Sequence, residues 1–256
     1  MVNTMEKDRY TKDFFDRRED SLHSAKIIVP ILSEYITPKS VLDVGCGTGA
    51  FLSVFEEQNG SAVFGVDGPW VAKEQLLIPA NNFLRTDLEQ PLDLKKKFDL
   101  VISLEVAEHI SASSAKTFVG NLVRHGDVVL FSAAIPHQGG THHINEQWPE
   151  YWAALFFEYD YVPIDCMRGK LWQSPEVSFW YAQNTFFFVK KEALSGLEPL
   201  KKEYEKTGGF VSSLVHPILF EAKAKKADRF DKLTRFIPYS LKSALLKLSL
   251  KRDSLY

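Results

Sequence analysis

The middle of the chain alternates short apolar runs with longer segments in which apolar residues recur every three or four positions. Such runs are typical of buried strands, and the segments between them are typical of helices. The apolar runs are SVLDVG (40–45), AVFGVD (62–67), FDLVISL (98–104), DVVLFSA (127–133), YVPIDCM (161–167) and AQNTFFFVKK (182–191). Strands alternating with crossover helices predict a parallel α/β sheet. The last two runs are joined by a predicted loop, 168–181, and therefore favour an antiparallel hairpin at the edge of the sheet.

Three regions differ in pattern. Residues 1–37 form a helical lead-in, residues 38–192 contain the predicted sheet, and residues 193–256 are helical and charged. In the lead-in, one face of the helix is formed by Leu22, Ala25, Ile28 and Leu32. We expect Pro30 to bend this helix or to split it in two, because proline lacks the N–H that a helix interior needs.

Composition limits the class of protein. The chain has 256 residues, of which 45% are hydrophobic and 25% charged, as in ordinary globular proteins. A net charge of −2 argues against overall electrostatic binding of nucleic acid. The sequence shows no apolar run of membrane-spanning length and no secretory signal, and its two cysteines suggest no disulfide framework. We therefore expect a cytoplasmic protein.

A glycine-rich turn follows the first predicted strand, in VLDVGCGTGAFL (41–52). Glycines allow close approach of a ligand to the backbone, and the following helix offers free N–H groups. The spacing is GxGxG, formed by Gly45, Gly47 and Gly49. Asp43 lies just before this turn, where a carboxylate suits the ammonium group of an amino acid better than a pyrophosphate.

Two further acids follow the next strands. Asp67 ends the second strand, where a carboxylate can accept hydrogen bonds from both ribose hydroxyls. Asp87 follows the third strand and is placed to meet an adenine amino group. Cys46 lies within the glycine turn, where it is either a thiolate nucleophile or a small side chain that fits the turn.

The run from 38 to 192 resembles the class I S-adenosylmethionine-dependent methyltransferases of type 11/12. The resemblance implies a Rossmann-like seven-stranded sheet of order 3-2-1-4-5-7-6, with the seventh strand antiparallel. It also implies that S-adenosylmethionine is bound by Asp43, Gly45, Gly47, Gly49, Asp67, Gly68, Asp87, Leu88 and Leu104. Tyr10, Phe14 and Phe15 would then fold over the donor as a lid, although simple packing explains them equally well.

An acidic cluster, SLEVAEHI (103–110), follows the fourth strand. Glu105, Glu108 and His109 have the i, i+3, i+4 spacing with which one helical turn aims side chains at a single point. Three interpretations are open. The cluster caps a helix, or one member acts as a general base, or it binds a divalent cation that lowers the pKa of an acceptor hydroxyl.

The segment GGTHHINEQW (139–148) follows the fifth strand and brings His142 and His143 to the same edge of the sheet. Two carboxylates and two imidazoles suit an octahedral cation such as Mg²⁺ or Mn²⁺. The pattern is similar to that of metal-dependent O-methyltransferases, and the matching ligands are Glu105, Glu108, His109 and His143. His142 is then a supporting residue or a general base, and His137 is a loop residue.

The later aromatic residues bear on the identity of the methyl acceptor. Trp172 and Trp180 either stack on a sugar ring or simply pack in the core. The stretch 139–189 resembles methyltransferases of bacterial polysaccharide pathways such as capsule synthesis, which implies a sugar or nucleotide-sugar acceptor. RNA 3′ ends and small phenols or quinols are alternatives, but no nucleic acid is expected because the basic residues gather in the tail. A cofactor-binding adaptor without activity is disfavoured by the intact cluster.

The tail is basic, with ten Lys/Arg and four Asp/Glu from Glu221 onward. Leu241, Ala244, Leu245 and Leu248 share one helical face there. This face either contacts an anionic membrane or a glycosyltransferase, or packs on its own core or on a second subunit, as in a homodimer. The sequence favours packing, because the amphipathic stretch is short.

Overall fold

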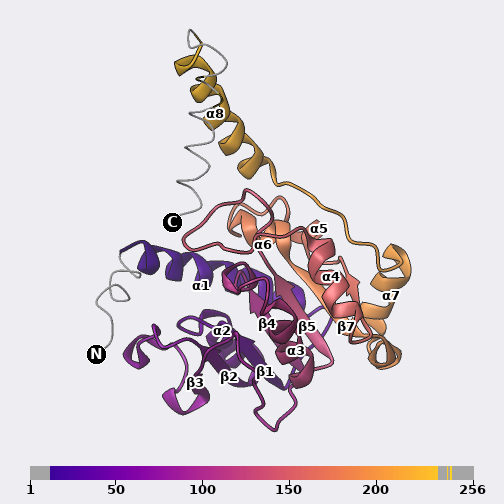
Figure 1. Ribbon diagram of the computed structural model, residues 1–256. Coiled ribbons are helices and arrows are strands. Elements are labelled where there is room, and N and C mark those ends of the chain that lie inside the picture. Colours follow the sequence, from indigo (N-terminus) through magenta and orange to yellow (C-terminus); the bar gives the residue numbers. More distant parts are fainter. Residues whose placement is uncertain (1–11, 236–240, 242, 244–256) are drawn as a thin grey trace.

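The computed structural model describes residues 12–235, 241 and 243, and its centre is a twisted sheet of seven strands (Figure 1). The strand order is β3-β2-β1-β4-β5-β7-β6. The strands are β1 (Ser40–Val44), β2 (Ala62–Asp67), β3 (Phe83–Arg85), β4 (Leu100–Leu104), β5 (Val128–Ser132), β6 (Tyr161–Ile164) and β7 (Phe186–Lys190). Strand β7 is antiparallel to both β5 and β6, and the other pairs are parallel. The predicted order and the antiparallel seventh strand are confirmed.

Helices cover both faces of the sheet. One apolar core joins α1 (Lys12–Leu32) and α2 (Ala50–Asn59) to one face, with Ile28 and Leu52 fully buried in it. A second core joins α3 (Ala115–His125) and α4 (Pro149–Phe157) to the other face. Because both faces are covered, the central strands read as continuous apolar runs.

Helix α1 runs unbroken past Pro30, so the predicted split does not occur. Pro30 lies only two residues before the helix end, where little helix remains to be disrupted. The predicted face is largely confirmed, because Ala25, Ile28 and Leu32 are completely buried.

The predicted loop 168–181 is wrong. It contains α5 (Arg168–Leu171) and the first half of α6 (Phe179–Asn184), and the last strand begins at Phe186 and not at Ala182. Tyr181 and Ala182 pack into the core from α6, and the Tyr181 ring meets Phe51 edge-on at 5.4 Å. This tertiary packing selects a helix for a sequence whose apolar content alone suggests a strand.

Beyond β7 the chain forms η5 (Lys191–Gly196), α7 (Glu198–Thr207) and α8 (Pro217–Leu233), and α8 projects away from the sheet (Figure 1). The remaining short 3₁₀ turns are η2 (Lys73–Gln75), η3 (Ala80–Asn82) and η4 (Ala107–His109). Of the predicted apolar face of the tail, only Leu241 belongs to the described residues. Tyr10 of the predicted lid lies outside them, and the side chains of Phe14 and Phe15 are not described either. Among the described helices, none has the length and hydropathy needed to span a bilayer.

Candidate active site

The glycine turn joins β1 to α2 at the carboxyl edge of the sheet. The amides of Gly45 and Cys46 both donate to the Val66 carbonyl, which fixes the turn against β2. Gly45 has a φ of +90°, and a Cβ at this position would lie 2.4 Å from Cγ2 of Val106. Only glycine fits there.

Asp43 and Asp67 bring two buried carboxylates to this turn. Burial, and then the charge of Asp67, raise the pKa of Asp43 well above its usual value. Burial also raises the pKa of Asp67, although its oxygens accept hydrogen bonds of 2.6 Å from the amides of Gly47 and Gly68. A positively charged ligand would relieve the cost of burying both carboxylates. The site therefore fits a donor with ammonium and sulfonium groups.

Trp70 is a neighbour of this site that the sequence analysis missed. Its indole lies against Gly68, where an added Cβ would come within 2.2 Å of the ring, and it donates a hydrogen bond to Asp67. The side chain remains 46% exposed. The sequence signal is VDGPW (66–70), where Trp70 follows closely on Gly68, a residue whose missing side chain leaves room for a large ring.

The other predicted donor residues lie close to the same edge. Leu88 and Leu104 are buried, and Asp87 is exposed and accepts the Glu89 amide at 3.0 Å. Their contact with adenine stays a prediction.

Cys46 packs against β2, where an added Cβ on Gly65 would lie 2.7 Å from its Sγ. Burial raises the pKa of its thiol, which argues against a nucleophile. Cys166 is also buried, and burial raises its pKa to about 12.

Glu108 carries the main unsatisfied charge of the site. Its side chain is 1% exposed, and neither oxygen accepts a hydrogen bond of ordinary geometry. Burial, and then the charge of Glu105, raise its pKa well above the usual value, although the amides of Glu108 and Ala134 lower it in part. A buried carboxylate left in this state requires a proton or a cation.

Two imidazoles face Glu108. Ligand atoms of Glu108, His109 and His143 lie within 4.8 Å of one another, and Nε2 of His143 is 3.9 Å from Oε1 of Glu108. The His109 and His143 rings meet edge-on, with centroids 4.8 Å apart. Nitrogen and oxygen atoms at this spacing can hold a divalent cation.

The orientation of both rings is fixed at Nδ1. Nδ1 of His109 donates to the His142 carbonyl at 3.1 Å, and Nδ1 of His143 donates to Glu146 at 2.9 Å. Because each Nδ1 donates to an oxygen, Nε2 is the nitrogen of each ring that is left to bind a cation. Acceptors at the second nitrogen are the usual support of metal-binding histidines. The residues present thus fit a divalent cation.

Two backbone hydrogen bonds hold the segment that carries His143. The amides of Ile144 and Asn145 donate to the Glu108 carbonyl at 2.9 and 3.0 Å. Burial disfavours the charge of Glu146, but hydrogen bonds from His143 and the Gly139 amide outweigh it and lower the Glu146 pKa. Glu146 was missed in the sequence analysis, although it lies three residues after His143.

Glu105 lies apart from these three residues. It precedes η4 with a φ of +57°, so the predicted single helical turn does not include it. Its oxygens accept hydrogen bonds from Asn184 at 3.0 Å and Gln138 at 2.9 Å. Burial raises its pKa, and these amides oppose the shift. Its role as a ligand stays a prediction.

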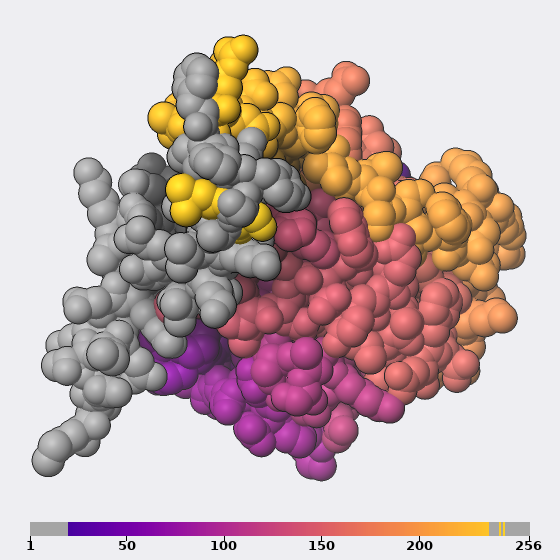
Figure 2. Space-filling model, turned by 45° about the horizontal axis from the view of Figure 1, so that its top comes forward, coloured from indigo at the N-terminus to yellow at the C-terminus, as the bar shows by residue number. Residues whose placement is uncertain are grey.

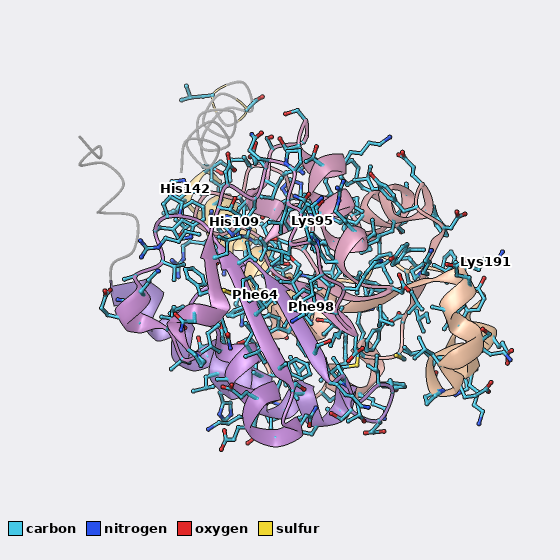
Figure 3. All side chains as sticks on the ribbon, turned by 90° about the horizontal axis from the view of Figure 1, so that it is seen from below. Phe64, Lys95, Phe98, His109, His142 and Lys191 are labelled. Atoms are coloured by element: carbon cyan, nitrogen blue, oxygen red, sulfur yellow. The ribbon has the colours of Figure 1, made fainter. Side chains whose placement is uncertain are left out.

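The remaining predicted residues fall outside the cluster. The His142 side chain is exposed, and Figure 3 shows it beside His109, to which it offers its carbonyl. His137 is exposed. Trp172 packs on His216 with centroids 4.8 Å apart, and Trp180 packs against the α1–α2 core, which favours packing for both.

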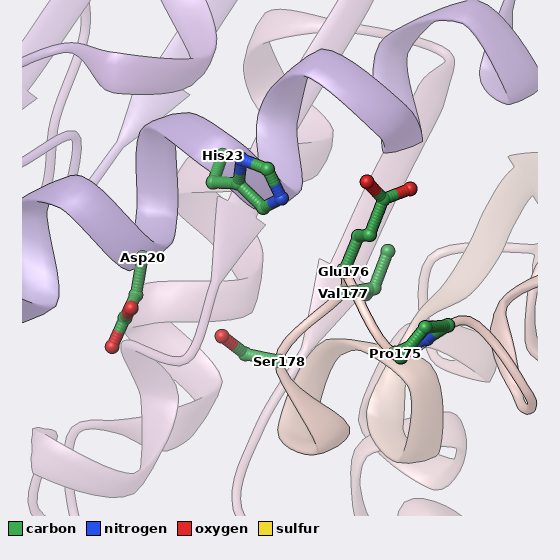
Figure 4. Close-up of a pocket in the computed structure, with 6 residues that line it drawn as sticks. All are labelled: Asp20, His23, Pro175, Glu176, Val177 and Ser178. Atoms are coloured by element: carbon green, nitrogen blue, oxygen red, sulfur yellow. The ribbon is translucent and has the colours of Figure 1, made fainter.

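A separate cleft of about 480 Å³ opens between α1 and the segment before α6 (Figure 4). None of the predicted site residues lines it. Its walls are formed by Asp20, His23, Pro175, Glu176, Val177 and Ser178.

A family model described as a methyltransferase domain matches residues 17–160, which is more than half of the chain. The chain belongs to this family. The strand order of the domain is that of the class I methyltransferases that use S-adenosylmethionine, and the resemblance seen in the sequence is confirmed at this level.

Curated relatives of the methyltransferase domain include ubiquinone biosynthesis O-methyltransferases from two Rickettsia species. The protein from Rickettsia conorii is 32% identical over 120 residues, or 42% of this chain, and that from Rickettsia typhi is 35% identical over 96 residues, or 35% of this chain. The matches span only 40% and 37% of the relatives' own lengths.

Solved structures share the fold of the methyltransferase domain. The sugar N-methyltransferase KedS8 from a Streptoalloteichus species has a TM-score of 0.55 and 17% identity, and covers 70% of this chain and 92% of its own. DesVI from Streptomyces venezuelae has a TM-score of 0.54 and 16% identity, and covers 74% of this chain and 99% of its own.

Proposed function

We propose that this methyltransferase domain transfers a methyl group from S-adenosylmethionine to a hydroxyl oxygen, and that Glu108, His109 and His143 hold a divalent cation beside that oxygen. The observation that carries the proposal is the Glu108 carboxylate, which is buried without an ordinary hydrogen bond and faces two imidazoles held at Nδ1. A donor-binding domain with a purely structural Glu108 would gain nothing from this arrangement.

The chemistry requires an activated acceptor, because a neutral alcohol is a weak nucleophile. Mg²⁺ or Mn²⁺, when bound, would lower the pKa of the acceptor hydroxyl. The chain's own residues do the remaining work. Asp43 and Asp67 orient the donor through its charged and hydroxyl groups, and Glu146 and the His142 carbonyl hold the two imidazole rings with Nε2 directed at the cluster.

We propose a sugar hydroxyl as the acceptor, on a nucleotide sugar or a surface-polysaccharide precursor in the cytoplasm. Support comes from the resemblance of residues 139–189 to polysaccharide-modifying methyltransferases, and vicinal sugar hydroxyls offer two oxygens to one cation. A phenol or quinol is a second candidate, because the curated relatives are named as ubiquinone biosynthesis enzymes. A catechol offers the same pair of adjacent oxygens.

A transfer assay with isotope-labelled donor tests the proposal. Nucleotide sugars, catechols and short RNAs are compared with Mn²⁺, with Mg²⁺ and with excess chelator. We expect methylation of a sugar or catechol oxygen that chelator abolishes and Mn²⁺ restores. Full activity in chelator would refute the cation and leave a general base, and labelling only at nitrogen or carbon would refute O-methylation.

A further inference from the structure

Glu105 is joined to the C-terminal part of the chain by a buried set of amide side chains. This amide network consists of Gln138, Gln183 and Asn184, all three of which are buried. Gln183 and Asn184 end α6, and Gln138 follows β5. The network lies between Glu105, at the end of β4, and His216, which caps the N-terminus of α8.

The direction of every hydrogen bond in the network is determined. The backbone N–H of His216 can only donate, and it meets Oε1 of Gln183 at 2.8 Å. Nε2 of Gln183 must then donate, and it reaches Oε1 of Gln138 at 3.0 Å and Oδ1 of Asn184 at 2.9 Å. The nitrogens of Gln138 and Asn184 are thereby left to donate to the two oxygens of Glu105, and Nδ2 of Asn184 also donates to Oε1 of Gln138 at 3.0 Å.

The segment 208–216, which connects α7 to α8, is fastened to the body around this point. Arg168 donates to the Ser212 carbonyl at 2.9 Å, and Nε2 of His216 donates to the Trp172 carbonyl at 2.9 Å. Figure 2 shows this segment lying along the surface of the body on its way to α8. The His216 amide is therefore held in register with Gln183.

We propose that Gln138, Gln183 and Asn184 are positioning residues that fix the Glu105 carboxylate at the acceptor end of the site, and that the connecting segment 208–216 completes this site through the His216 amide. The inference rests on the proposed function for its kinetic consequence. The Glu105 amide donates to Ser132 at the end of β5, so Glu105 lies at the carboxyl ends of the two strands that lead to Glu108 and to His143. Buried polar networks act as units, because water cannot replace a lost member.

A pair of variants at His216 isolates the first hydrogen bond. His216 has a φ of −66°, which is the proline value, so His216→Pro removes the N–H without changing that angle. His216→Ala is the matched control, because it loses the same imidazole contacts and keeps the N–H. We expect kcat/KM for the acceptor to be about tenfold lower in His216→Pro than in His216→Ala, as for loss of one partner in a buried hydrogen bond. The donor Kd should be the same in both.

A second pair of variants keeps the inference testable if proline impairs folding. Asn184→Asp replaces a donor to Glu105 with a carboxylate at almost unchanged volume. Asn121→Asp makes the same change at a buried amide on α3 whose side chain bonds the backbone of Leu92 and Gln90 and no member of the amide network. At matched unfolding free energy, Asn184→Asp should reduce acceptor kcat/KM at least about tenfold relative to Asn121→Asp, without change in the donor Kd. Equal kinetics in both pairs would overturn the inference.

NMR separates this inference from the proposed function. The side-chain amide protons of Gln138 and Asn184 should shift between His216→Pro and His216→Ala, whether or not the protein methylates any hydroxyl. If the wild-type chain shows no O-methylation but these resonances shift, the amide network stands and the proposed function fails. Identical resonances in the two variants would refute the network itself.

Discussion

At the scale of single residues, the site is built from carboxylates whose burial lowers the stability of the ligand-free protein. Asp43, Asp67 and Glu108 are buried, and burial raises the pKa of each. Buried carboxylates lower the free energy of unfolding when no positively charged ligand is bound. Such a loss of stability is common where function requires a pre-formed site. The two predictions that follow test this cost at the donor and at the cation.

Asp43→Asn should stabilise the donor-free protein at neutral pH and weaken donor binding. Because the folded pKa of Asp43 lies above its unfolded value of about 3.9, the folded state holds this proton more tightly. The contribution of this proton to the free energy of unfolding is therefore fully present below the unfolded pKa. It is lost as the pH rises through the folded pKa, by at most about 1.4 kcal/mol per pH unit. Denaturant unfolding across this range should show a shallower decline in Asp43→Asn.

Asp127→Asn is the control, because it removes an exposed carboxylate. An unchanged pH dependence in Asp43→Asn would show that Asp43 does not hold its proton in the folded state.

Glu108→Gln should abolish cation-dependent turnover and leave the donor Kd within about twofold. Removal of a ligand should cost more than the 10–100-fold typical of supporting residues. The measurement combines steady-state kinetics in Mn²⁺ with calorimetry of donor binding. Glu57→Gln, on the exposed side of α2, serves as control. Loss of donor binding instead would mean that Glu108 is structural.

At the scale of elements, the strand-to-helix turn after β1 packs closely against the residue that precedes η4. Gly45 and Gly47 both have positive φ, but they differ in their surroundings. A Cβ on Gly45 would collide with Val106, whereas a Cβ on Gly47 would meet nothing within 4 Å. Val106 directly precedes η4, so this contact couples the donor turn to the acidic cluster.

Gly45→Ala should therefore cost more than Gly47→Ala. Gly47→Ala should lower the free energy of unfolding only by the cost of a left-handed backbone at alanine, about 1–2 kcal/mol. Gly45→Ala should add the cost of the collision with Val106, about 1–3 kcal/mol. Chemical denaturation of the two single variants and of Gly45→Ala/Val106→Ala measures the difference. The added Val106→Ala should recover part of the loss, and equal costs at both glycines would contradict the close approach.

The elements that sequence could predict are those specified by local pattern. The strands, the glycine turn and the position of His143 follow from apolar runs and glycine spacing. The orientation of Glu105 does not, because it depends on a φ of +57° and on Gln138 and Asn184, which lie 33 and 79 residues away in the chain. Gln183 and Asn184 were assigned to a strand because their partners are known only from tertiary structure.

At the scale of the whole molecule, the site draws on both halves of the sheet. β1 and β2 supply the carboxylates proposed to bind the donor, and η4, which follows β4, and the segment after β5 supply the proposed cation ligands. Since this cluster exists only in the folded chain, cation binding is linked to global stability.

Mn²⁺ should raise the Tm of the wild-type protein and not that of Glu108→Gln. At a hundredfold excess over the Kd, binding adds about 2.7 kcal/mol, which corresponds to roughly 5–10 °C for a chain of this size. Differential scanning calorimetry with and without chelator measures the shift. Equal shifts in both proteins would place the cation elsewhere.

The two buried cysteines can be used to measure local opening of the fold. Cys46 and Cys166 lie on opposite sides of the sheet order, beside β2 and after β6, and both thiols are protonated and shielded in the native state. An alkylating reagent can therefore tag each of them only during a transient opening. Mass spectrometry can compare the alkylation rates of the two cysteines. Equal rates would indicate that the regions around Cys46 and Cys166 open together, and different rates would indicate that they open separately.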